Sequence, residues 1–579
     1  MTARPFGIPP WSNPPLRIPS LLHDLPIIAC GLAFLYGVLS LTHYWTGQVA
    51  AQAEIHLNAA ALPRYALFSL ARILIAYLIS LLVAVAYGYV AARYRTAERF
   101  LIPLLDTLQS IPVLSFLPPV MVSMVALFPG TQLGVELGSI LLIFTGQVWN
   151  MAFSVYASLR NIPSEMMEAA RVYRMGRVQR FFQVELPYSA IGLVWNSMMS
   201  VAGGWFFLMA CEMFALGNHD FRLPGLGSYL QTAANAGNTG AILWGIAAMV
   251  TVIVLMDQVM WRPLIAWSEK FKFEQVEASQ VPRSLVLDWL RRSRLLSRVG
   301  RAAVEPASEA LMRRFARQAL SPPANPAQNR WKLRLAQAAG VAVLAATGYA
   351  LARMALMLTA LTAADLRGIL LGAGATFLRV EFTLVLAGLW TIPVGIFIGL
   401  RPKLSALAQP IAQIAASVPA TALFPIVLLL LIRAGGGLGI GSMVLLLLGT
   451  QWYVLFNVIA GASAIPSDLK EVTAVFRFGT VERWKKLFLP AVFPYLITGF
   501  VTASGGAWNA SIVAEYFRFH GQTFTITGLG AAISRATDSG DLPMLLAATL
   551  VMAALVVTVN RLLWRRLYAL AATRFSLET

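Results

Sequence analysis

Two stretches of this chain decide its architecture: IPSEMMEAARVYRMG at residues 162–176 and IPSDLKEVTAVFRFG at residues 465–479. In each, a serine followed by an acidic residue predicts the start of a short helix, with Ser164 and Ser467 as N-caps. The glycine that closes each stretch predicts the end of that helix. Because the same capped loop occurs twice, the sequence predicts a chain built from two related halves.

The repeat extends well beyond the two loops. Both loops leave through a Leu-Pro pair, which turns the chain into the next apolar segment. A shift of 307 positions superposes the early parts of the halves, and a shift of 303 positions superposes the later parts. The superposed pairs include Arg72 and Arg379, Trp149 and Trp452, Trp205 and Trp508, and Glu212 and Glu515.

The composition is that of a membrane protein. Of 579 residues, 58% are hydrophobic and only 12% are charged, whereas a soluble chain carries about 25% charged residues. Segments near the roughly 20 residues that span a bilayer lie at 26–45, 66–92, 103–128, 138–158, 190–216 and 241–264, and again at 333–358, 368–400, 408–432, 438–460, 491–516 and 543–564. We therefore expect an all-α polytopic fold with two six-helix parallel repeats, about 12 transmembrane helices in all, related by a two-fold axis along the membrane normal.

The positive charges predict the orientation. The net charge is +19, and Lys and Arg gather in every second loop, as in the cytoplasmic loops of membrane proteins. This pattern places both termini in the cytoplasm and explains the charge without a nucleic-acid partner. The run at 26–44 is longer than a signal-peptide core of roughly 7–15 residues, so we interpret it as a retained first membrane helix.

Several site classes are disfavoured. Cys30 and Cys211 lie in apolar runs, and the five histidines are scattered, so the sequence predicts neither a disulfide framework nor a metal site. No Gly-x-x-x-x-Gly-Lys-Ser/Thr motif occurs, so we expect no P-loop ATPase site and no cofactor in this chain.

We divide the chain into a first membrane domain at 1–267, a basic cytoplasmic linker at 268–332 and a second membrane domain at 333–579. The loops that face the cytoplasm are then 162–187 and 465–490. The stretch 268–334 contains fourteen Lys and Arg against six Asp and Glu. Within it, 284–301 has helical periodicity, so it either lies on the inner membrane surface or is a solvated linker.

The third apolar segment of each half is interrupted by proline. Pro112 lies about 11 residues, or ~16 Å, along a helix from the cytoplasmic end, near the bilayer midplane. Broken backbone at this depth is tolerated where it lines a cavity, which makes Gln109, Ser110 and Ser417 candidates for a translocation pathway. Simple kinks in packed helices are the alternative.

Polar and aromatic residues within the spans are further candidates. They either face a central cavity or pack between helices: Trp149, Asn150, Trp452, Trp205, Trp508 and Asn509. Charged groups at membrane depth are expected to pair. We therefore predict the ion pairs Arg72–Glu212 and Arg379–Glu515, one per half, with a structural role in preference to substrate contact.

The two loops resemble the EAA loop of ABC importer permeases, whose pattern is Glu-Ala-Ala, three residues, Gly, nine residues, an aliphatic residue, one residue and Leu-Pro. Glu168, Ala169 and Ala170 match it, and so does Glu471, although Val472 and Thr473 replace the two alanines of the second copy.

Both copies depart from the pattern in the same way. Arg174 and Arg477 occupy its glycine position, and Gly176 and Gly479 follow two residues later. The chain is most similar to the nitrate, taurine, sulfonate and bicarbonate branch of the family, including a duplicated form described as anion permeases.

This resemblance implies a type I ABC importer fold and a permease subunit of the bacterial inner membrane. It implies that the two loops, through Glu168, Ala169, Ala170, Arg174, Gly176, Glu471, Arg477 and Gly479, couple to two ABC ATPase subunits, which bind ATP and Mg. A periplasmic or lipid-anchored substrate-binding protein would deliver a small solute, an anion such as nitrate, a sulfonate or bicarbonate, for translocation by alternating access. The chain itself would then be no enzyme.

A secondary transporter driven by an ion gradient, with parallel repeats, is the alternative function. It would need no cytoplasmic ATPase. The duplicated capped loop argues against it, because such a helix is suited to docking in a groove of a soluble partner.

Overall fold

The computed structural model describes residues 54–574, apart from 217–218, 272–283, most of 294–329, 434, 436 and 520–521. The expected first span at 26–45, with Cys30, lies outside the described residues, and so do both termini.

In the described part of the first half, ten α-helices are joined by short turns and one small hairpin. Its elements are η1 (Ala59–Ala61), α2 (Leu62–Arg93), α3 (Arg95–Ser110), η2 (Val113–Phe116), α4 (Leu117–Leu127), α5 (Leu133–Arg160), α6 (Ser164–Val172), α7 (Arg177–Arg180), η3 (Phe181–Glu185), α8 (Leu186–Glu212), β1 (Ala215–Leu216), β2 (His219–Asp220), α9 (Leu226–Asn235), α10 (Thr239–Met256), η4 (Asp257–Trp261) and α11 (Arg262–Ser268). The short helices η5 (Glu269–Phe271) and α12 (Leu285–Arg292) follow α11 in the chain.

The second half repeats this order. Its elements are α15 (Arg330–Leu358), α16 (Ala363–Gly399), α17 (Pro402–Ser417), α18 (Ala420–Arg433), α19 (Leu438–Ser463), α20 (Ser467–Val475), α21 (Thr480–Arg483), η8 (Trp484–Phe488), α22 (Leu489–Ala514), β3 (Tyr516–Phe519), β4 (Gln522–Thr525), α23 (Leu529–Ser539), α24 (Leu542–Val559), η9 (Asn560–Trp564) and α25 (Arg565–Arg574). Both hairpins are antiparallel, with Ala215 opposite Asp220 and Tyr516 opposite Thr525.

The predicted all-α polytopic membrane fold is confirmed. Among the described residues, eight helices are long and apolar enough to cross a bilayer, and the number rises to nine if the pair around Pro112, bent by 87°, is counted as one broken span. These nine correspond to nine of the twelve predicted segments. Of the other three, 26–45 is not described, α15 is apolar only over Ala345–Leu358, and the segment at 408–432 is split into α17 and α18.

Each half is organised around three long helices. In the first half α5 packs between α2 and α8, and in the second α19 packs between α16 and α22. Close approach is possible because small residues face inward. A Cβ on Gly88 would lie 2.7 Å from Val155, and one on the equivalent Gly395 would lie 2.6 Å from Val458. Large apolar side chains such as Leu82 and Leu378 point outward instead, where lipid can solvate them.

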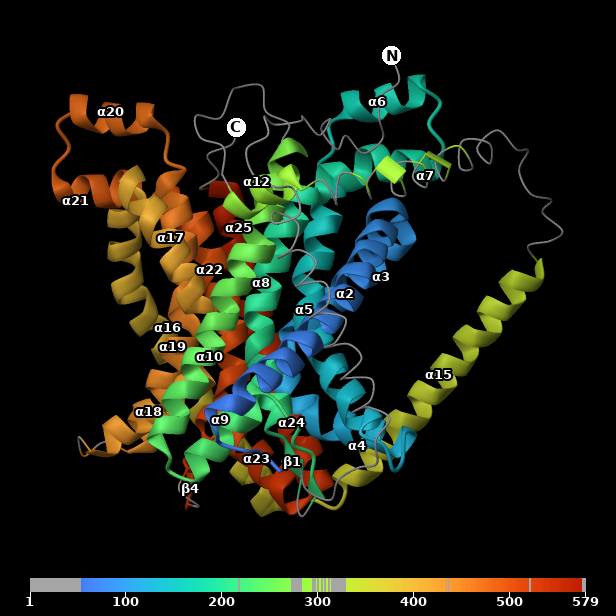
Figure 1. The fold of residues 1–579 in the computed structure, drawn as a ribbon, viewed down its shortest axis with the longest axis vertical. Coiled ribbons are helices and arrows are strands. Elements are labelled where there is room, and N and C mark those ends of the chain that lie inside the picture. The colour runs from blue at the N-terminus through green and yellow to red at the C-terminus, as the bar shows by residue number, and fades with distance from the viewer. Residues whose placement is uncertain are drawn as a thin grey trace.

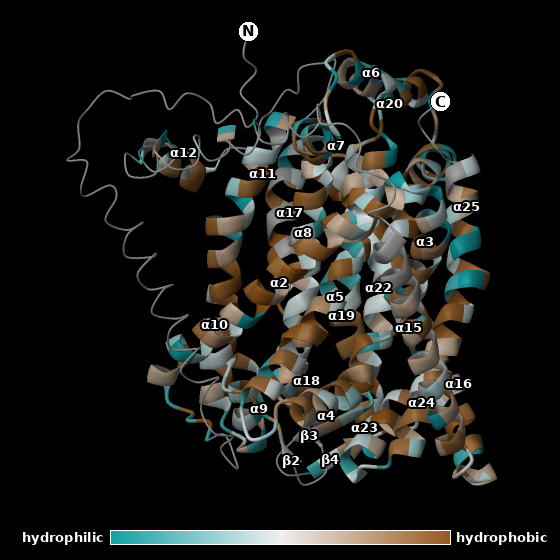
Figure 2. Ribbon diagram, turned by 90° about the vertical axis from the view of Figure 1, so that its right-hand side faces the viewer, coloured by the Kyte–Doolittle hydropathy of each residue, from teal (hydrophilic) through white to brown (hydrophobic). Residues whose placement is uncertain are grey.

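The two ends of the molecule differ. Figure 1 shows α6 and α20, each above its short partner α7 or α21, at one end, and α4, α9, α18 and α23 at the other. In Figure 2 hydrophobic residues dominate the long helices, and hydrophilic residues gather around α6, α7 and α12. The halves meet where α17 packs against α8 and α10, and where α3 packs against α24 and η2 against α22.

Candidate functional site

The two repeated loops, 162–187 and 465–490, have the same backbone geometry. α6 ends at Val172 and α20 at Val475, each four residues before the glycine that was expected to end it. Arg174 and Arg477 follow, both with φ of +49°, and among the described residues they are the two non-glycine residues with positive φ. A residue in this region breaks a helix. The prediction that the glycines end these helices is therefore wrong, because the arginines already do so.

Gly176 and Gly479 begin the next helix and do not end the preceding one. Each is the N-cap of the following short helix, with φ of −64°. The N–H of Gly176 donates to Gln179 Oε1 at 3.1 Å, and that of Gly479 to Glu482 Oε2 at 3.2 Å. The expected cap at Ser164 is also wrong, since Pro163 is the N-cap residue of α6 and no side chain caps that end.

Both loops present an apolar tip to solvent. Val172 and Tyr173 are 79% and 76% exposed, and their equivalents Val475 and Phe476 are 78% and 69% exposed. Glu168, Ala169 and Glu471 are exposed too, whereas Ala170 is buried. Paired exposed apolar residues on a short helix are typical of a docking surface.

A single turn of π-helix, which we call the π-turn, joins each loop to a long helix. η3 runs directly into α8 and the equivalent η8 into α22. Arg180 Nε donates to Glu185 Oε1 at 2.8 Å across the first π-turn, and Phe181 packs edge-on against Tyr89 of α2. Isolated π-turns occur frequently at functional sites. The turn is continuous with α7 before it and with α8 after it, so that Arg177–Glu212 forms one long helix.

The far ends of these helices hold a buried cluster of charges. Arg72 Nη1 lies 2.8 Å from Glu212 Oε1, and Arg72 donates through Nε and Nη2 to both carboxylate oxygens of Glu136 at 2.6 Å. All three side chains are fully buried. Ser69 Oγ donates to Glu212 Oε1 at 2.6 Å and accepts from the N–H of Leu226 at 2.9 Å.

Two helix N-termini balance the cluster. Glu136 lies in the first turn of α5, and the N–H of Gly227, at the start of α9, donates to Glu212 Oε2 at 2.7 Å. Each N-terminus contributes about half a positive charge, so two carboxylates, one guanidinium and two helix ends sum to near neutrality. A Cβ on Gly225 would collide with the Glu212 carboxylate, which explains why glycine is needed there.

The second half repeats the cluster with one carboxylate fewer among the described residues. Arg379 pairs with Glu515, whose Oε1 accepts from Thr376 Oγ1 at 2.8 Å and whose Oε2 accepts from the N–H of Gly530 at 2.8 Å. Both ion pairs expected from the sequence are thus present. Sequence reasoning missed Glu136, whose position in the second half is occupied by Gly439. An acidic residue at the start of an apolar segment was the available signal.

Three pathway candidates lie near the break in the third span. Gln109 Nε2 donates to Asn150 Oδ1 at 3.0 Å. The N–H of Leu114, freed by the interruption of the helix, lies 3.4 Å from Asn509 Oδ1 of the other half. Ser110 is the last residue of α3. The structure therefore brings Gln109, Asn150 and Asn509 to the same interrupted region.

The tryptophan candidates lie within helix packing. Trp205 and Trp508 are fully buried, and within the described residues neither indole N–H has a hydrogen-bond partner. Trp149 packs edge-on against Tyr87, with ring centroids 6.4 Å apart, and Trp452 packs against a small apolar cluster around Leu455. Of the two alternatives for these residues, the geometry favours packing between helices.

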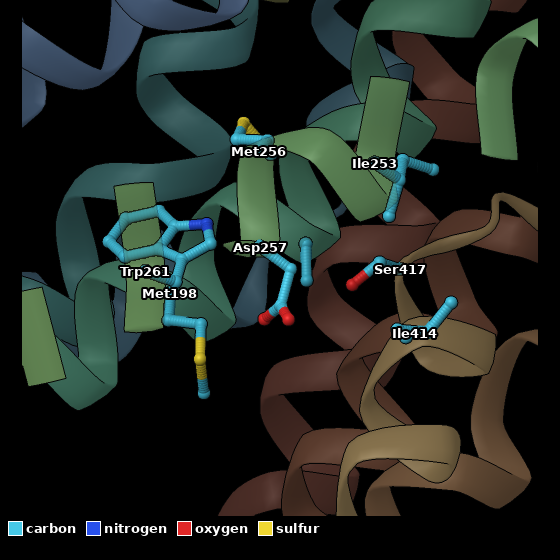
Figure 3. A pocket seen from close by; sticks show the side chains of 8 residues that line it. Met198, Ile253, Met256, Asp257, Trp261, Ile414 and Ser417 are labelled. Atoms are coloured by element: carbon cyan, nitrogen blue, oxygen red, sulfur yellow. The ribbon is translucent and has the colours of Figure 1, made fainter. Parts of the chain in front are cut away.

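Ser417 lines a small cavity between the halves. In Figure 3 its hydroxyl and the carboxylate of Asp257 point toward the same space, between α17 and η4. The cavity measures about 10 Å³, the size of one water molecule. Asp257 also accepts from Arg262 Nε at 3.1 Å. Sequence reasoning missed Asp257, whose equivalent in the second half is Asn560.

In the part of the chain that the structure describes, no group of three or more His, Cys, Asp or Glu side chains converges as metal ligands would. The charged cluster around Arg72 is closed by its own partners.

Comparison with known proteins identifies the repeat. The family model "Binding-protein-dependent transport system inner membrane component" matches twice, at residues 76–260 and 391–575. A bicarbonate transport system permease protein of Synechococcus elongatus is 30% identical over 141 residues, 24% of this chain and 49% of the relative. A nitrate import permease protein of Leptolyngbya laminosa is 28% identical over 149 residues, 26% of this chain and 52% of the relative.

A glycine betaine transport system permease protein of Bacillus subtilis is 25% identical over 191 residues, 33% of this chain and 62% of the relative. The chain thus spans about half the length of the first two relatives and somewhat more of the third.

Proposed function

This chain belongs to the family of binding-protein-dependent transport system inner membrane components, and we propose that it is a permease of an ATP-driven ABC importer, with two permease domains in one polypeptide. Separate ABC ATPase subunits would bind and hydrolyse ATP with Mg, and this chain would supply the route through the membrane. The relatives that it matches are permease proteins.

The observation that carries the proposal is the pair of exposed helices at one end of the molecule. α6 and α20 have the same length, the same left-handed arginine after them and the same apolar tip. Two equivalent docking elements suit two ATPase subunits, one for each half. A carrier driven by an ion gradient has no need of such a pair.

Force would pass from α6 through residues 173–176 into the continuous helix that α7, η3 and α8 form. A movement of α6 passes through η3 into α8, whose last residue, Glu212, is held by Arg72 and by the start of α9. The same route leads from α20 to Glu515. Each half would therefore respond as a rigid unit, which is what alternation between inward-facing and outward-facing states requires.

For the substrate we propose a small anion of the nitrate, sulfonate or bicarbonate kind, delivered by a periplasmic or lipid-anchored binding protein. The names of two relatives, for bicarbonate and nitrate, support this choice. Donors near the interrupted third span, such as the side-chain amides of Gln109, Asn150 and Asn509, suit an anion without fixing it by a full charge. The relative named for glycine betaine makes a zwitterion the second candidate.

We place the chain in the bacterial inner membrane, with α6 and α20 in the cytoplasm and α9 and α23 facing the receptor side. This orientation follows from the distribution of Lys and Arg. It puts both chain ends in the cytoplasm and the buried charge clusters near the receptor side.

The docking proposal is tested by affinity purification of the tagged permease from its native host, with ABC ATPase chains identified by mass spectrometry. Tyr173→Asp combined with Phe476→Asp should lose the ATPase subunits, because both changes put a charge in the apolar tips. Tyr568→Asp is the matched control, since Tyr568 is an exposed aromatic residue on α25. An ATPase that is retained equally by all three proteins contradicts the proposal. A wild-type chain that purifies alone favours the secondary transporter.

A further inference from the structure

An open cavity lies in the first half between α5 and α8, which run side by side toward the end of the molecule that carries α6 (Figure 1). Its volume is about 380 Å³, which is within the range of small-molecule sites. Six of its lining residues offer either a hydrogen-bonding group or an aromatic ring: Phe153, Ser154, Ser158, Asn161, Tyr188 and Asn196. The cavity therefore combines polar groups with apolar surface, as ligand sites do.

The cavity continues the interrupted region of the third span toward the loop 162–187. Asn150 accepts from Gln109 beside the break in that span. Ser154 and Asn161 follow Asn150 on the same side of α5, and Asn161 lies ~16 Å farther along the helix. Asn161 also directly precedes the loop. The cavity thus lies between the candidate pathway and the element that we propose to bind an ATPase.

The cavity also borders the second half. On α8, Asn196 lies two helical turns before Gly203 and therefore on the same side of the helix. A Cβ on Gly203 would lie 3.7 Å from the hydroxyl of Tyr453 in α19. α8 packs against α17 and α18 of the second half as well. A solute that passes between the halves can therefore reach the cavity.

A difference between the halves leaves this space open. Gly192 of α8 corresponds to Tyr495 in the second half, and Ser158 of α5 corresponds to Gly461. The Tyr495 side chain lies against Gly461, because a Cβ on that glycine would be 2.9 Å from its Cγ and Cδ2 atoms. A Cβ on Gly192 would instead meet the hydroxyls of Ser154 and Ser158, at 3.0 and 3.2 Å. The first half thus has two hydroxyls where the second half has an aromatic ring.

Three donors on α5 are left for a ligand. In the part of the chain that the structure describes, the hydroxyls of Ser154 and Ser158 and the side-chain amide of Asn161 have no hydrogen-bond partner. The hydroxyl of Tyr188 is already engaged, since it donates to the Asn161 carbonyl at 2.9 Å. Hydroxyl and amide groups donate to anionic oxygens without carrying a charge themselves.

The charges around the cavity favour an anion. Among the described residues that line it, none is acidic. Glu98 of the adjoining α3 is held by the Tyr156 hydroxyl at 2.6 Å and by Arg160 at 3.7 Å. The loops 162–187 and 465–490 together carry nine Lys and Arg against six Asp and Glu. Such an excess of positive charge raises the local concentration of anions.

We propose that this cavity binds a small organic anion, an organosulfonate or a similar oxyanion with a carbon body. Ser154, Ser158 and Asn161 would donate to its oxygens, and the rings of Phe153 and Tyr188 would pack against its carbon atoms. A nitrate or bicarbonate ion has no carbon body to cover the rings and would leave much of the cavity to water. The inference rests on the proposed function, narrows its substrate to organic anions and assigns the site to one half.

Protection of an engineered cysteine tests the proposal in the purified full chain in nanodiscs. Ala157→Cys places a thiol in the cavity without removing a donor, and Thr480→Cys, exposed at the start of α21, is the matched control. The background is Cys30→Ser, and Cys211 is fully buried and should not react. Butanesulfonate should slow the reaction with N-ethylmaleimide severalfold at 157 and leave it unchanged at 480. Nitrate and butyltrimethylammonium at the same concentration should protect far less.

Two sets of variants test the lining. Ser154→Ala and Ser158→Ala should each raise the butanesulfonate concentration for half-protection by about tenfold, as the loss of a hydrogen bond to a charged group does. Gly192→Tyr reproduces the residue of the second half and should abolish the protection. If this larger change prevents folding, the serine variants still decide, because each removes a single oxygen atom.

Three outcomes would overturn the proposal: no protection by butanesulfonate, equal protection by nitrate, or protection by butyltrimethylammonium. The assay contains no ATPase, which separates it from the docking experiment. A permease that captures ATPase subunits yet shows no protection overturns this inference alone. A permease that shows the protection but captures no ATPase overturns the importer and leaves the binding site in place.

Discussion

Arg174 and Arg477 illustrate what single residues contribute to this fold. A left-handed conformation costs an ordinary residue about 1–2 kcal/mol relative to the right-handed one, yet both loops adopt it, with φ of +49°. The family pattern has glycine at this position, and the departure from it left the turn geometry open in the sequence. The structure shows that the turn is kept and that arginine is accommodated in it. A substitution that relieves this strain should therefore raise the stability of the loop.

Arg174→Gly should therefore stabilise the first loop by up to about 1 kcal/mol, because glycine adopts positive φ without a steric penalty. Arg174→Val should destabilise it, since a β-branched side chain is poorly tolerated there. Thermal unfolding of the purified permease, with Gly176→Ala as the control at a negative φ, measures both. A valine variant as stable as the glycine variant would contradict this account of the turn.

The buried charges permit a second prediction at this scale. Arg72→Met leaves two buried carboxylates without their counter-ion, whereas Arg379→Met leaves one. Removing one partner of a buried pair costs about 3–5 kcal/mol, so we expect the loss of stability at Arg72 to be clearly larger than that at Arg379. Glu136→Gln in the Arg72→Met background should restore part of it. Equal losses at the two arginines, measured by unfolding in detergent, would show that Glu136 adds nothing.

At the scale of elements, the sequence predicted where the long helices lie but not how they pack. Their existence follows from apolar length, which is a local property. Their ends were less predictable. α6 ends at Val172 because Arg174 adopts a positive φ, which the sequence does not indicate since arginine rarely has this conformation. The contact between α5 and α8 was also beyond prediction, because it depends on which side chains meet across two helices distant in sequence.

That contact differs between the halves in a compensated way. A Cβ on Gly204 of α8 would collide with Gln147 Nε2 of α5. The equivalent positions of the second half hold Ala507 and Thr450, so a larger residue on one helix is matched by a smaller one on the other. The side chains at these two positions thus fill a similar space between the helices in both halves, although the larger share of the volume comes from a different helix.

Gly204→Ala should destabilise the first half by about 1–3 kcal/mol, the usual cost of overpacking. Gln147→Thr in the same chain should restore most of the loss, because it reproduces the pair found in the second half. A double-mutant cycle on unfolding free energies provides the test, and strictly additive effects would show that the two positions do not interact. Gly203→Ala is the control on the neighbouring face, where a Cβ would lie 3.7 Å from the nearest atom, the Tyr453 hydroxyl.

At the scale of the whole molecule, the repeat predicted two equivalent halves and the structure contains them, yet their interface is not symmetric. The hydrogen bond from the N–H of Leu114 to Asn509 Oδ1 has no two-fold equivalent. The corresponding residues are Thr421 and Phe206, and the phenylalanine side chain has no acceptor. A repeat in the sequence predicts the elements that the halves share, but it does not predict which residues of one half contact the other. The candidate pathway could therefore be predicted as a region around Pro112, but not as a set of contacts.

The central claim is that α6 and α20 each engage a nucleotide-hydrolysing subunit. A photo-reactive amino acid at position 173 or at position 476, cross-linked in native membranes and identified by mass spectrometry, measures this most directly, with position 568 as the control. The account predicts that both loop positions capture an ABC ATPase chain and that the control position does not. Cross-links from both loops to lipid alone, or to no ATP-hydrolysing protein, would contradict it.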